Sequence, residues 1–166
     1  MDPKYSSSNG FMTKIWGPML WPVLHMISMN FPVKPTIEDR NNYFNFIFGL
    51  TKVLPCGACR KNLILNLKEV GFSKEISLKN RESFSLFMFT LHEKINNMLG
   101  NDNLLITFDQ YRDKLELFRA ECTSGTKHDG CIKPTHINKS KCVISIIPED
   151  DGLLGDGIYV DKRCFL

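Results

Sequence analysis

Apolar residues recur at spacings of three and four along most of the chain up to Phe118, and this period restricts the fold to packed helices. Trp16, Leu20 and Leu24 show the spacing in the first such segment. Because each segment has one apolar face to bury, the sequence predicts an all-α fold, a bundle of four main helices with a shorter fifth. The expected helices cover about 15–30, the stretch between Thr36 and Pro55, the stretch from Cys56 to Gly71, Arg81–Leu99, and a segment that starts at Thr107.

Several of these boundaries carry residues that favour helix ends. Thr36 is a typical N-cap, and Thr107 with Gln110 forms a typical capping box. Gly100 suits the left-handed position that ends a helix. Pro18 is compatible with the first helix only near its start, where backbone N–H groups have no intrahelical partner.

The composition changes after Glu121. Gly, Asp, Lys and Ser are common there, and no helical period survives. Residues 143–147 and 158–160 are typical of short strands, and the turn-rich stretch between them favours a hairpin. The expected organisation is a flexible N-terminal lead at 1–12, a helical domain at 13–121 and a cysteine-containing extension at 122–166.

Composition and charge exclude some classes of protein. The chain is 43% hydrophobic and 23% charged with a net charge of +3, which is ordinary for a globular domain. No stripe of Lys and Arg interleaves with aromatic residues, so we expect no nucleic-acid partner. The first residues lack the pattern of a secretion signal. Ile15–Val33 has no charged residue, but its three prolines favour a buried helix over a membrane span.

The chain has six cysteines, and two of them form a C-x-x-C pair in Pro55-Cys56-Gly57-Ala58-Cys59. Two cysteines three apart at a helix start share a face and can form a small disulfide ring. The partial positive charge of a helix N-terminus stabilises a thiolate, which favours a reactive pair. Half of a zinc site and two buried thiols are the alternatives; a four-cysteine zinc site usually has a second close pair, which this chain lacks, so no metal site is expected.

Two further groups of residues are candidates for binding a cofactor. His92, Asn96 and Leu99 share a face of the fourth expected helix, beside its apolar stripe. A buried polar pair needs partners, which a cofactor rich in acceptors would supply, although both residues could equally lie on the surface. The first expected helix carries Trp16, Gly17, Trp21 and His25, whose rings suit stacking on a flat ligand but also suit a core.

Together and in this order, these groups resemble the Erv/ALR family of FAD-linked sulfhydryl oxidases. The family pattern W-G-x-x-x-W-x-x-L-H, then P-C-x-x-C, then H-N-x-V-N-x-x-L is matched here by WGPMLWPVLH at 16–25, PCGAC at 55–59 and HEKINNML at 92–99. The resemblance covers about 13–118 and is strongest to the short members encoded by large DNA viruses.

The resemblance implies a helical bundle that binds FAD and uses the cysteine pair for catalysis. Cys59 would be the sulfur next to the flavin, and Cys56 the outer sulfur that exchanges with substrate. The flavin would lie along Trp16, Gly17, Trp21 and His25, and the adenine end along His92, Asn96 and Leu99.

The implied reaction joins two thiols as a disulfide and passes their electrons to molecular oxygen, which gives hydrogen peroxide. The implied partners are thiol-containing proteins, including a thioredoxin-like carrier, and a second copy of the chain in a homodimer formed by the first two helices. The implied location is a host cytoplasm or a virion, with the mitochondrial intermembrane space as the alternative.

The chain departs from the family pattern at positions that bear on its function. Glu93 stands where the family has Asn, and Leu54 where a Tyr often precedes the Pro. Phe89 holds the place of the first cysteine of a structural disulfide that cellular members carry, so that disulfide is not expected here.

The extension carries Cys122, Cys131, Cys142 and Cys164. We expect them to staple a segment too short to build its own core. The alternative is an electron shuttle to Cys56, for which Cys164 is the best candidate because chain ends are mobile. Two other classes stay open, a flavin-free thiol–disulfide exchanger and a zinc module that uses cysteines and histidines of this extension.

Overall fold

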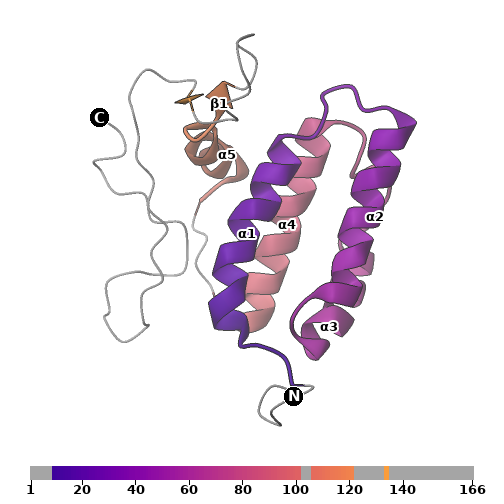
Figure 1. The fold of residues 1–166 in the computed structure, drawn as a ribbon, viewed down its shortest axis with the longest axis vertical. Helices are drawn as coiled ribbons and strands as arrows, with labels where there is room; N and C mark the ends of the chain where they lie inside the picture. Colours follow the sequence, from indigo (N-terminus) through magenta and orange to yellow (C-terminus); the bar gives the residue numbers. More distant parts are fainter. Residues whose placement is uncertain (1–8, 102–105, 122–132, 135–166) are drawn as a thin grey trace, which may run out of the picture. The chain divides into compact units, whose positions relative to one another are not determined.

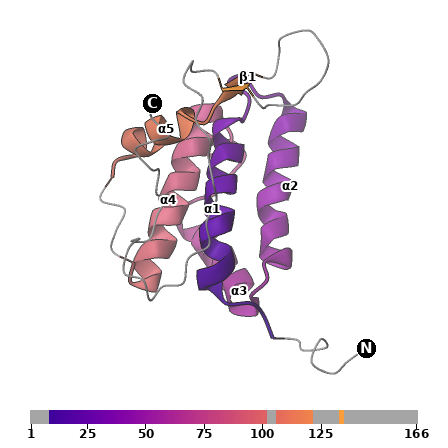
Figure 2. The same ribbon diagram turned by 60° about the vertical axis from the view of Figure 1, so that its left-hand side comes forward.

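The computed structural model describes residues 9–101, 106–121 and 133–134, which belong to two compact units divided after Asn103. The first unit is a bundle of four helices, α1 (Thr13–Met29), α2 (Ile37–Val53), α3 (Gly57–Glu69) and α4 (Arg81–Leu99). Helix α1 packs along α4, α2 packs against α3, and α3 also contacts α4 (Figures 1 and 2). The predicted all-α fold with four main helices is confirmed.

The second unit contains the predicted short helix, α5 (Phe108–Glu116). After it, β1 (Ala120–Glu121) pairs in antiparallel register with β2 (Lys133–Pro134), which the sequence did not predict. Two residues are too few to show the alternation that marks a strand. The strands expected at 143–147 and 158–160 lie outside the described residues, and the predicted domain limits stay a prediction.

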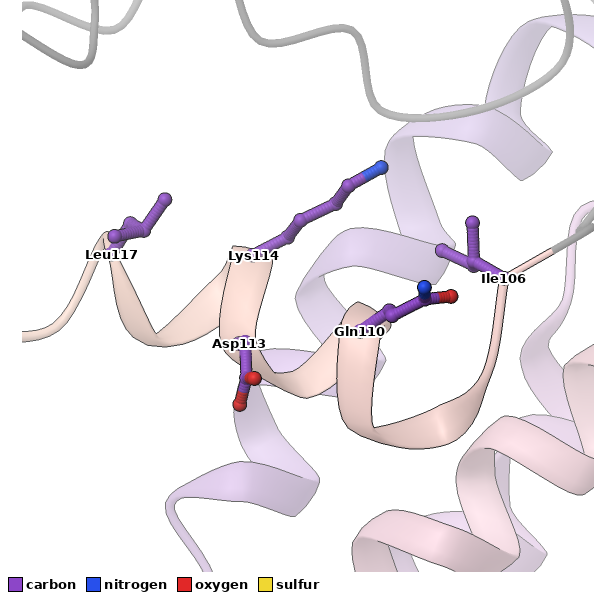
Figure 3. A pocket seen from close by; sticks show the side chains of 5 residues that line it. All are labelled: Ile106, Gln110, Asp113, Lys114 and Leu117. Atoms are coloured by element: carbon purple, nitrogen blue, oxygen red, sulfur yellow. The ribbon is translucent and has the colours of Figure 1, made fainter.

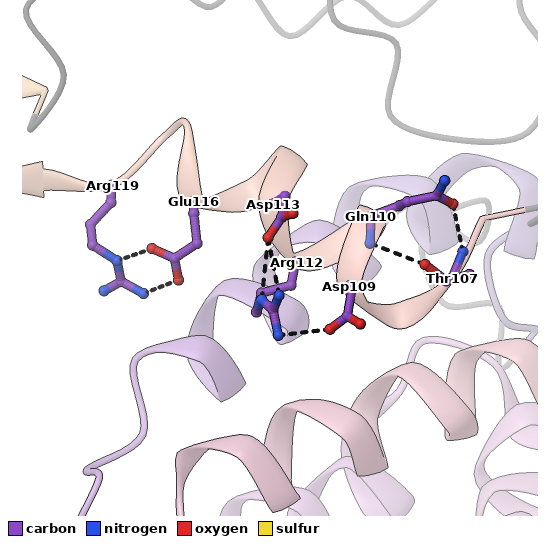
Figure 4. A network of polar contacts seen from close by, with 7 residues as sticks. All are labelled: Thr107, Asp109, Gln110, Arg112, Asp113, Glu116 and Arg119. Atoms are coloured by element: carbon purple, nitrogen blue, oxygen red, sulfur yellow. Dashed lines mark hydrogen bonds and ion pairs between the residues drawn. The ribbon is translucent and has the colours of Figure 1, made fainter.

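Side chains cap the helices where the sequence predicted it. At the start of α2, Thr36 Oγ1 accepts the Asp39 N–H at 3.1 Å, and Asp39 accepts the Thr36 N–H at 2.8 Å. Thr107 and Gln110 exchange the same two bonds at the start of α5, beside ion pairs of Arg112 and Arg119 with acidic neighbours (Figure 4). Each box satisfies two N–H groups that a helix start leaves unpaired.

The prolines of α1 lie deeper in the helix than predicted. Because α1 begins at Thr13, Pro18 and Pro22 are both inside it, and neither can donate a backbone hydrogen bond to the preceding turn. The expectation that Pro18 lies near the helix start, among the unpaired N–H groups, is therefore wrong. Leu24, with 4% of its surface exposed, packs into the core from the same helix, and tertiary packing of this kind overrides the local preference.

The core of the first unit is built around aromatic rings from three segments. Phe31 and Phe84 are fully buried with ring centroids 5.3 Å apart, and Tyr43 meets both rings edge-on. Edge-to-face pairs contribute beyond the area they bury. The predicted stripe of α4 holds at Phe84 and Leu91 but not at Met98, which is half exposed near the end of the helix.

We predict that Phe84→Ala lowers the free energy of unfolding by about 3–5 kcal/mol, because it removes a ring from a closely packed cluster and leaves a cavity. Leu86 lies on the same helix but is 46% exposed, so Leu86→Ala serves as the matched control. The control should cost less than about 1 kcal/mol. Urea titrations of both variants measure the difference, and equal losses would contradict the assignment of Phe84 to the core.

Candidate redox site

The two cysteines of the C-x-x-C pair form a disulfide at the first turn of α3. Cys56 is the N-cap of this helix, and its Sγ accepts the backbone N–H of Cys59 at 3.1 Å. Both residues are partly buried. A sulfur at this position receives a hydrogen bond and the positive end of the helix dipole, and both stabilise a thiolate when the disulfide opens.

The segment before α1 contacts this site through its backbone. The Phe11 N–H donates to the Pro55 carbonyl at 2.7 Å, and Trp16 Nε1–H donates to the Phe11 carbonyl at 3.2 Å. A Cβ added to Gly10 would lie 2.5 Å from the Pro55 oxygen and 2.9 Å from the Cys56 Cα. Only glycine allows this approach, which lies within the stretch 1–12 that the sequence predicts as a flexible lead.

Thr13 connects the first residue of α1 to the other cysteine. Its Oγ1 lies 3.5 Å from Cys59 Sγ. Because Cys59 is in a disulfide and carries no proton, the hydroxyl of Thr13 is the donor. Residues from 10 to 16 therefore contact both halves of the redox pair, and sequence reasoning did not identify Gly10, Phe11 or Thr13.

Arg60 closes the turn between α2 and α3. Its Nη1 donates to the Leu54 carbonyl at 2.5 Å, and its Nη2 lies 3.6 Å from where a Cβ of Gly57 would stand. The guanidinium thus satisfies a carbonyl at the end of α2 and places a positive charge beside the start of α3.

Further along α1, three of the singled-out rings meet across the contact with α4. His25 Nε2 and His92 Nδ1 are 3.0 Å apart, and the Trp21 ring stacks on the His92 ring with centroids 4.0 Å apart. His25 is fully buried, whereas Trp21 and His92 are partly exposed. The structure therefore joins residues that the sequence could only place on separate helices.

Burial keeps both histidines neutral. It lowers the pKa of His25 to about 3, with the nearby His92 adding to the shift, and it lowers the pKa of His92 to about 4. One ring must donate and the other accept in their shared hydrogen bond, which neutral rings can do.

The remaining candidate cofactor-binding residues differ in their exposure to solvent. Gly17 is buried, Trp16 and Asn96 are partly buried, and Leu99 is 53% exposed. Glu93, the departure from the family pattern, has a buried Oε1 without a hydrogen-bond partner among the described residues. Burial raises the pKa of its carboxyl group above the usual value.

These residues fit FAD in their chemistry. The rings of Trp16 and Trp21 offer flat apolar faces, Asn96 offers an amide, and Glu93 Oε1 offers an acceptor for a hydroxyl or amino group of a nucleotide. The contact of Thr13 with Cys59 places the same helix that carries the tryptophans next to the redox pair.

Two other kinds of site receive no support in the described residues. No group of three or more His, Cys, Asp or Glu could hold a metal ion in 9–101, 106–121 and 133–134, and the zinc candidates of the extension lie outside these ranges. A depression along α5 is lined by Ile106, Gln110, Asp113, Lys114 and Leu117 (Figure 3). It holds no candidate redox or cofactor residue.

No described helix is long and apolar enough to cross a membrane.

Comparison with known proteins shows the family of this chain. The Erv1 / Alr family matches residues 18–115, and the chain belongs to this family. The match starts after Gly10 and Thr13, so the contacts of that segment with the cysteines lie outside it.

Several relatives are named for their chemistry. A protein of Acanthamoeba polyphaga mimivirus named "probable FAD-linked sulfhydryl oxidase" is 29% identical over 61% of this chain and 68% of its own length. An FAD-linked sulfhydryl oxidase of African swine fever virus is 27% identical over 61% of this chain and 80% of its own. The mitochondrial FAD-linked sulfhydryl oxidase of Schizosaccharomyces pombe is 30% identical over 51% of this chain and 45% of its own.

The fold has solved counterparts. The yeast Erv1 core matches with a TM-score of 0.55 at 18% identity, over 69% of this chain and 92% of that one. This supports the same helical fold for the two chains.

We predict that Gly10→Ala destabilises the protein by about 1–3 kcal/mol, because the new methyl group forces the chain away from Pro55. Gly49 is the matched control, since a Cβ there would meet nothing within 4 Å. Gly49→Ala should stabilise by about 0.5–1 kcal/mol, because it lies inside α2. Thermal melting compares them, and a Gly10→Ala melt equal to the parent's would contradict the close approach.

We predict that acid weakens the bundle through His25 and His92. In the unfolded chain both imidazoles take up a proton near the ordinary pKa of 6.5. In the folded chain the pKa is about 3 for His25 and about 4 for His92. The free energy of unfolding therefore has its full value well above pH 6.5. It decreases as the pH drops through 6.5, by about 2 kcal/mol per histidine at pH 5. Urea titrations across this range measure the slope. His92→Gln should reduce it, and a flat profile in the parent would contradict the neutral pair.

Proposed function

We propose that this protein is an FAD-dependent sulfhydryl oxidase, which joins protein thiols as disulfides, uses oxygen as acceptor and releases hydrogen peroxide. One observation carries the proposal. The Cys56–Cys59 disulfide lies at a helix N-terminus, and Thr13 links it to the helix that carries Trp16, Trp21 and His25. Membership of the Erv1 / Alr family and the names of the viral and fungal relatives support the same chemistry.

Cys56 is the sulfur that a substrate attacks. Its Sγ caps α3, and its neighbours Gly57 and Ala58 are exposed, while Cys59 packs against the core and against Thr13. A substrate thiolate forms a bond to Cys56 Sγ, the Cys56–Cys59 bond breaks, and the electron pair stays on Cys59. A second substrate thiolate then attacks the first substrate sulfur, which releases the substrate disulfide and leaves Cys56 as a thiolate.

The protein stabilises each sulfur as it gains charge. The Thr13 hydroxyl donates to Cys59 Sγ, and the Cys59 N–H donates to Cys56 Sγ. Hydrogen bonds to an ionised group are stronger than those to a neutral one, so both contacts favour the reduced, thiolate form.

FAD, when bound, would accept the two electrons from the dithiol and pass them on to oxygen. Trp16, Gly17, Trp21 and His25 of α1 would hold its ring system, and His92, Asn96 and Leu99 of α4 its adenine end. Neutral His25 and His92 add no charge to this region. Glu93 would accept a hydrogen bond where the family pattern has an amide.

A homodimer through the first two helices is part of the proposal. Ile15, Met19, Val23 and Met26 recur at helical spacing on α1, and all are 42–50% exposed. Exposed apolar residues in one row are typical of a surface that a partner covers. A host cytoplasm or a virion is the proposed location because two of the relatives are viral, with the mitochondrial intermembrane space as the alternative.

The rival classes are less well supported. A thioredoxin-like exchanger places its C-x-x-C in a βαβ unit, whereas here the pair starts a helix of an all-α bundle. The zinc module depends on residues outside the described ranges. The roles of Cys122, Cys131, Cys142 and Cys164 as staples or shuttle stay a prediction.

The purified protein should be yellow and should consume oxygen with dithiothreitol. Cys56→Ser and Cys59→Ser should both lose this turnover, because each removes one half of the disulfide. They should differ in colour, since only Cys56→Ser keeps the Cys59 thiolate next to the flavin and should show an added long-wavelength band. Ala58→Ser, an exposed change between the cysteines, is the matched control and should keep its turnover. Colourless protein would reject the function, and identical spectra of the two cysteine variants would reject the assignment of inner and outer sulfur.

A further inference from the structure

Basic residues gather at the end of the bundle that holds the disulfide. Lys14 is in the first turn of α1, Lys52 is in the last turn of α2, and Arg60 and Lys61 are in the first turns of α3. These helix ends meet, because Phe11 bonds Pro55 and Thr13 contacts Cys59, and both ribbon views show them at the same end (Figures 1 and 2). Lys14, Lys52 and Lys61 are exposed.

Around Lys52, Arg60 and Lys61, the neighbouring described sequence supplies no carboxylate. Residues 9–37 and 40–68 contain no Asp or Glu. The carboxylates of the described first unit lie at the start of α2, at the end of α3, around the start of α4 and within α4, at Glu38, Asp39, Glu69, Glu75, Glu82 and Glu93. The start of α2, the end of α3 and the start of α4 therefore mix both signs. The charged side chains at the start of α1, the end of α2 and the start of α3 are all basic, and Glu93 is the acidic residue in the last two turns of α4.

Apolar side chains accompany the charge. The side chains of Phe11, Met12 and Val53 are 76%, 71% and 70% exposed. They lie within two residues of the backbone hydrogen bond between Phe11 and Pro55. A surface that combines exposed apolar groups with one sign of charge suits a polypeptide of the opposite sign.

We propose that this basic end is the docking surface for the protein substrate, and that preferred substrates carry carboxylates next to the reacting cysteines. The inference rests on the proposed oxidase function, because it is Cys56 at this end that exchanges with the substrate. Positive groups around a reactive sulfur raise the local concentration of anionic partners and speed their association. The substrate thiolate is itself an anion, so the same field favours the attacking form.

The experiment uses the full chain with its flavin and three synthetic peptides with the same pair of cysteines. The flanking residues are Glu in one peptide, Ser in the second and Lys in the third. We expect kcat/KM, measured by oxygen uptake, to be roughly tenfold higher for the Glu peptide than for the Lys peptide at low salt. Salt of about 0.5 M, where the screening length is roughly 4 Å, should remove most of this preference.

Matched charge reversals locate the effect. Lys52→Glu with Lys61→Glu changes the redox end, while Lys34→Glu with Lys79→Glu makes the same change of net charge in the loops that follow α1 and precede α4. All four lysines are exposed. The first pair should abolish or reverse the preference for the Glu peptide, and the second should leave it largely intact. Both should keep turnover of uncharged dithiothreitol, which also shows that they fold.

Each outcome decides one claim. Equal rates for the three peptides, or a preference for the Lys peptide, would overturn the docking proposal while dithiothreitol turnover leaves the oxidase function standing. Equal effects of the two double variants would assign the preference to net charge and overturn the docking surface. Absence of dithiothreitol turnover in the parent would instead reject the oxidase function.

Discussion

The hydrogen bond from the Cys59 N–H to Cys56 Sγ is the contact on which the site depends. It makes one cysteine the cap of α3 and fixes the other one turn inside the helix. The start of α3 cannot move without moving the sulfurs, and Pro55, directly before the cap, stops α2 from extending into it. Cys56 Sγ meets the structural need for a capped helix, and in the proposed reaction the same contact would stabilise its thiolate.

The contacts of the N-terminal segment extend this arrangement to α1. Thr13 reaches Cys59, and Phe11 reaches Pro55, so the helix with the tryptophans starts where the redox pair lies. Farther along, the bond between His25 and His92 joins α1 to α4. An oxidase of this kind needs a sulfur pair and a flat cofactor at contact distance. This series of contacts would fix the positions of α1, α3 and α4 relative to one another, and so the distance between the sulfurs and the cofactor.

Sequence patterns predicted the helices well because their signals are local. The limits of α4, the N-cap at Thr36 and the capping box at Thr107 follow from residues within one turn of each other. The approach of Gly10 to Pro55 and the pairing of His25 with His92 join residues 45 and 67 positions apart, and one sequence carries no sign of such pairs. Pro18 misled the prediction because its local cost is real, and α1 continues through it with several residues buried against the rest of the bundle, Leu24 and Met29 among them.

The uneven charge of the bundle also bears on how it moves before any contact forms. With mainly basic side chains at the redox end and both signs at the other, the described part of the first unit would have an electric dipole moment along its helices. In the field of an anionic molecule such a body experiences a torque that turns the positive end forward. Because docking two specific patches requires the correct orientation, fewer encounters would then be lost to the wrong one.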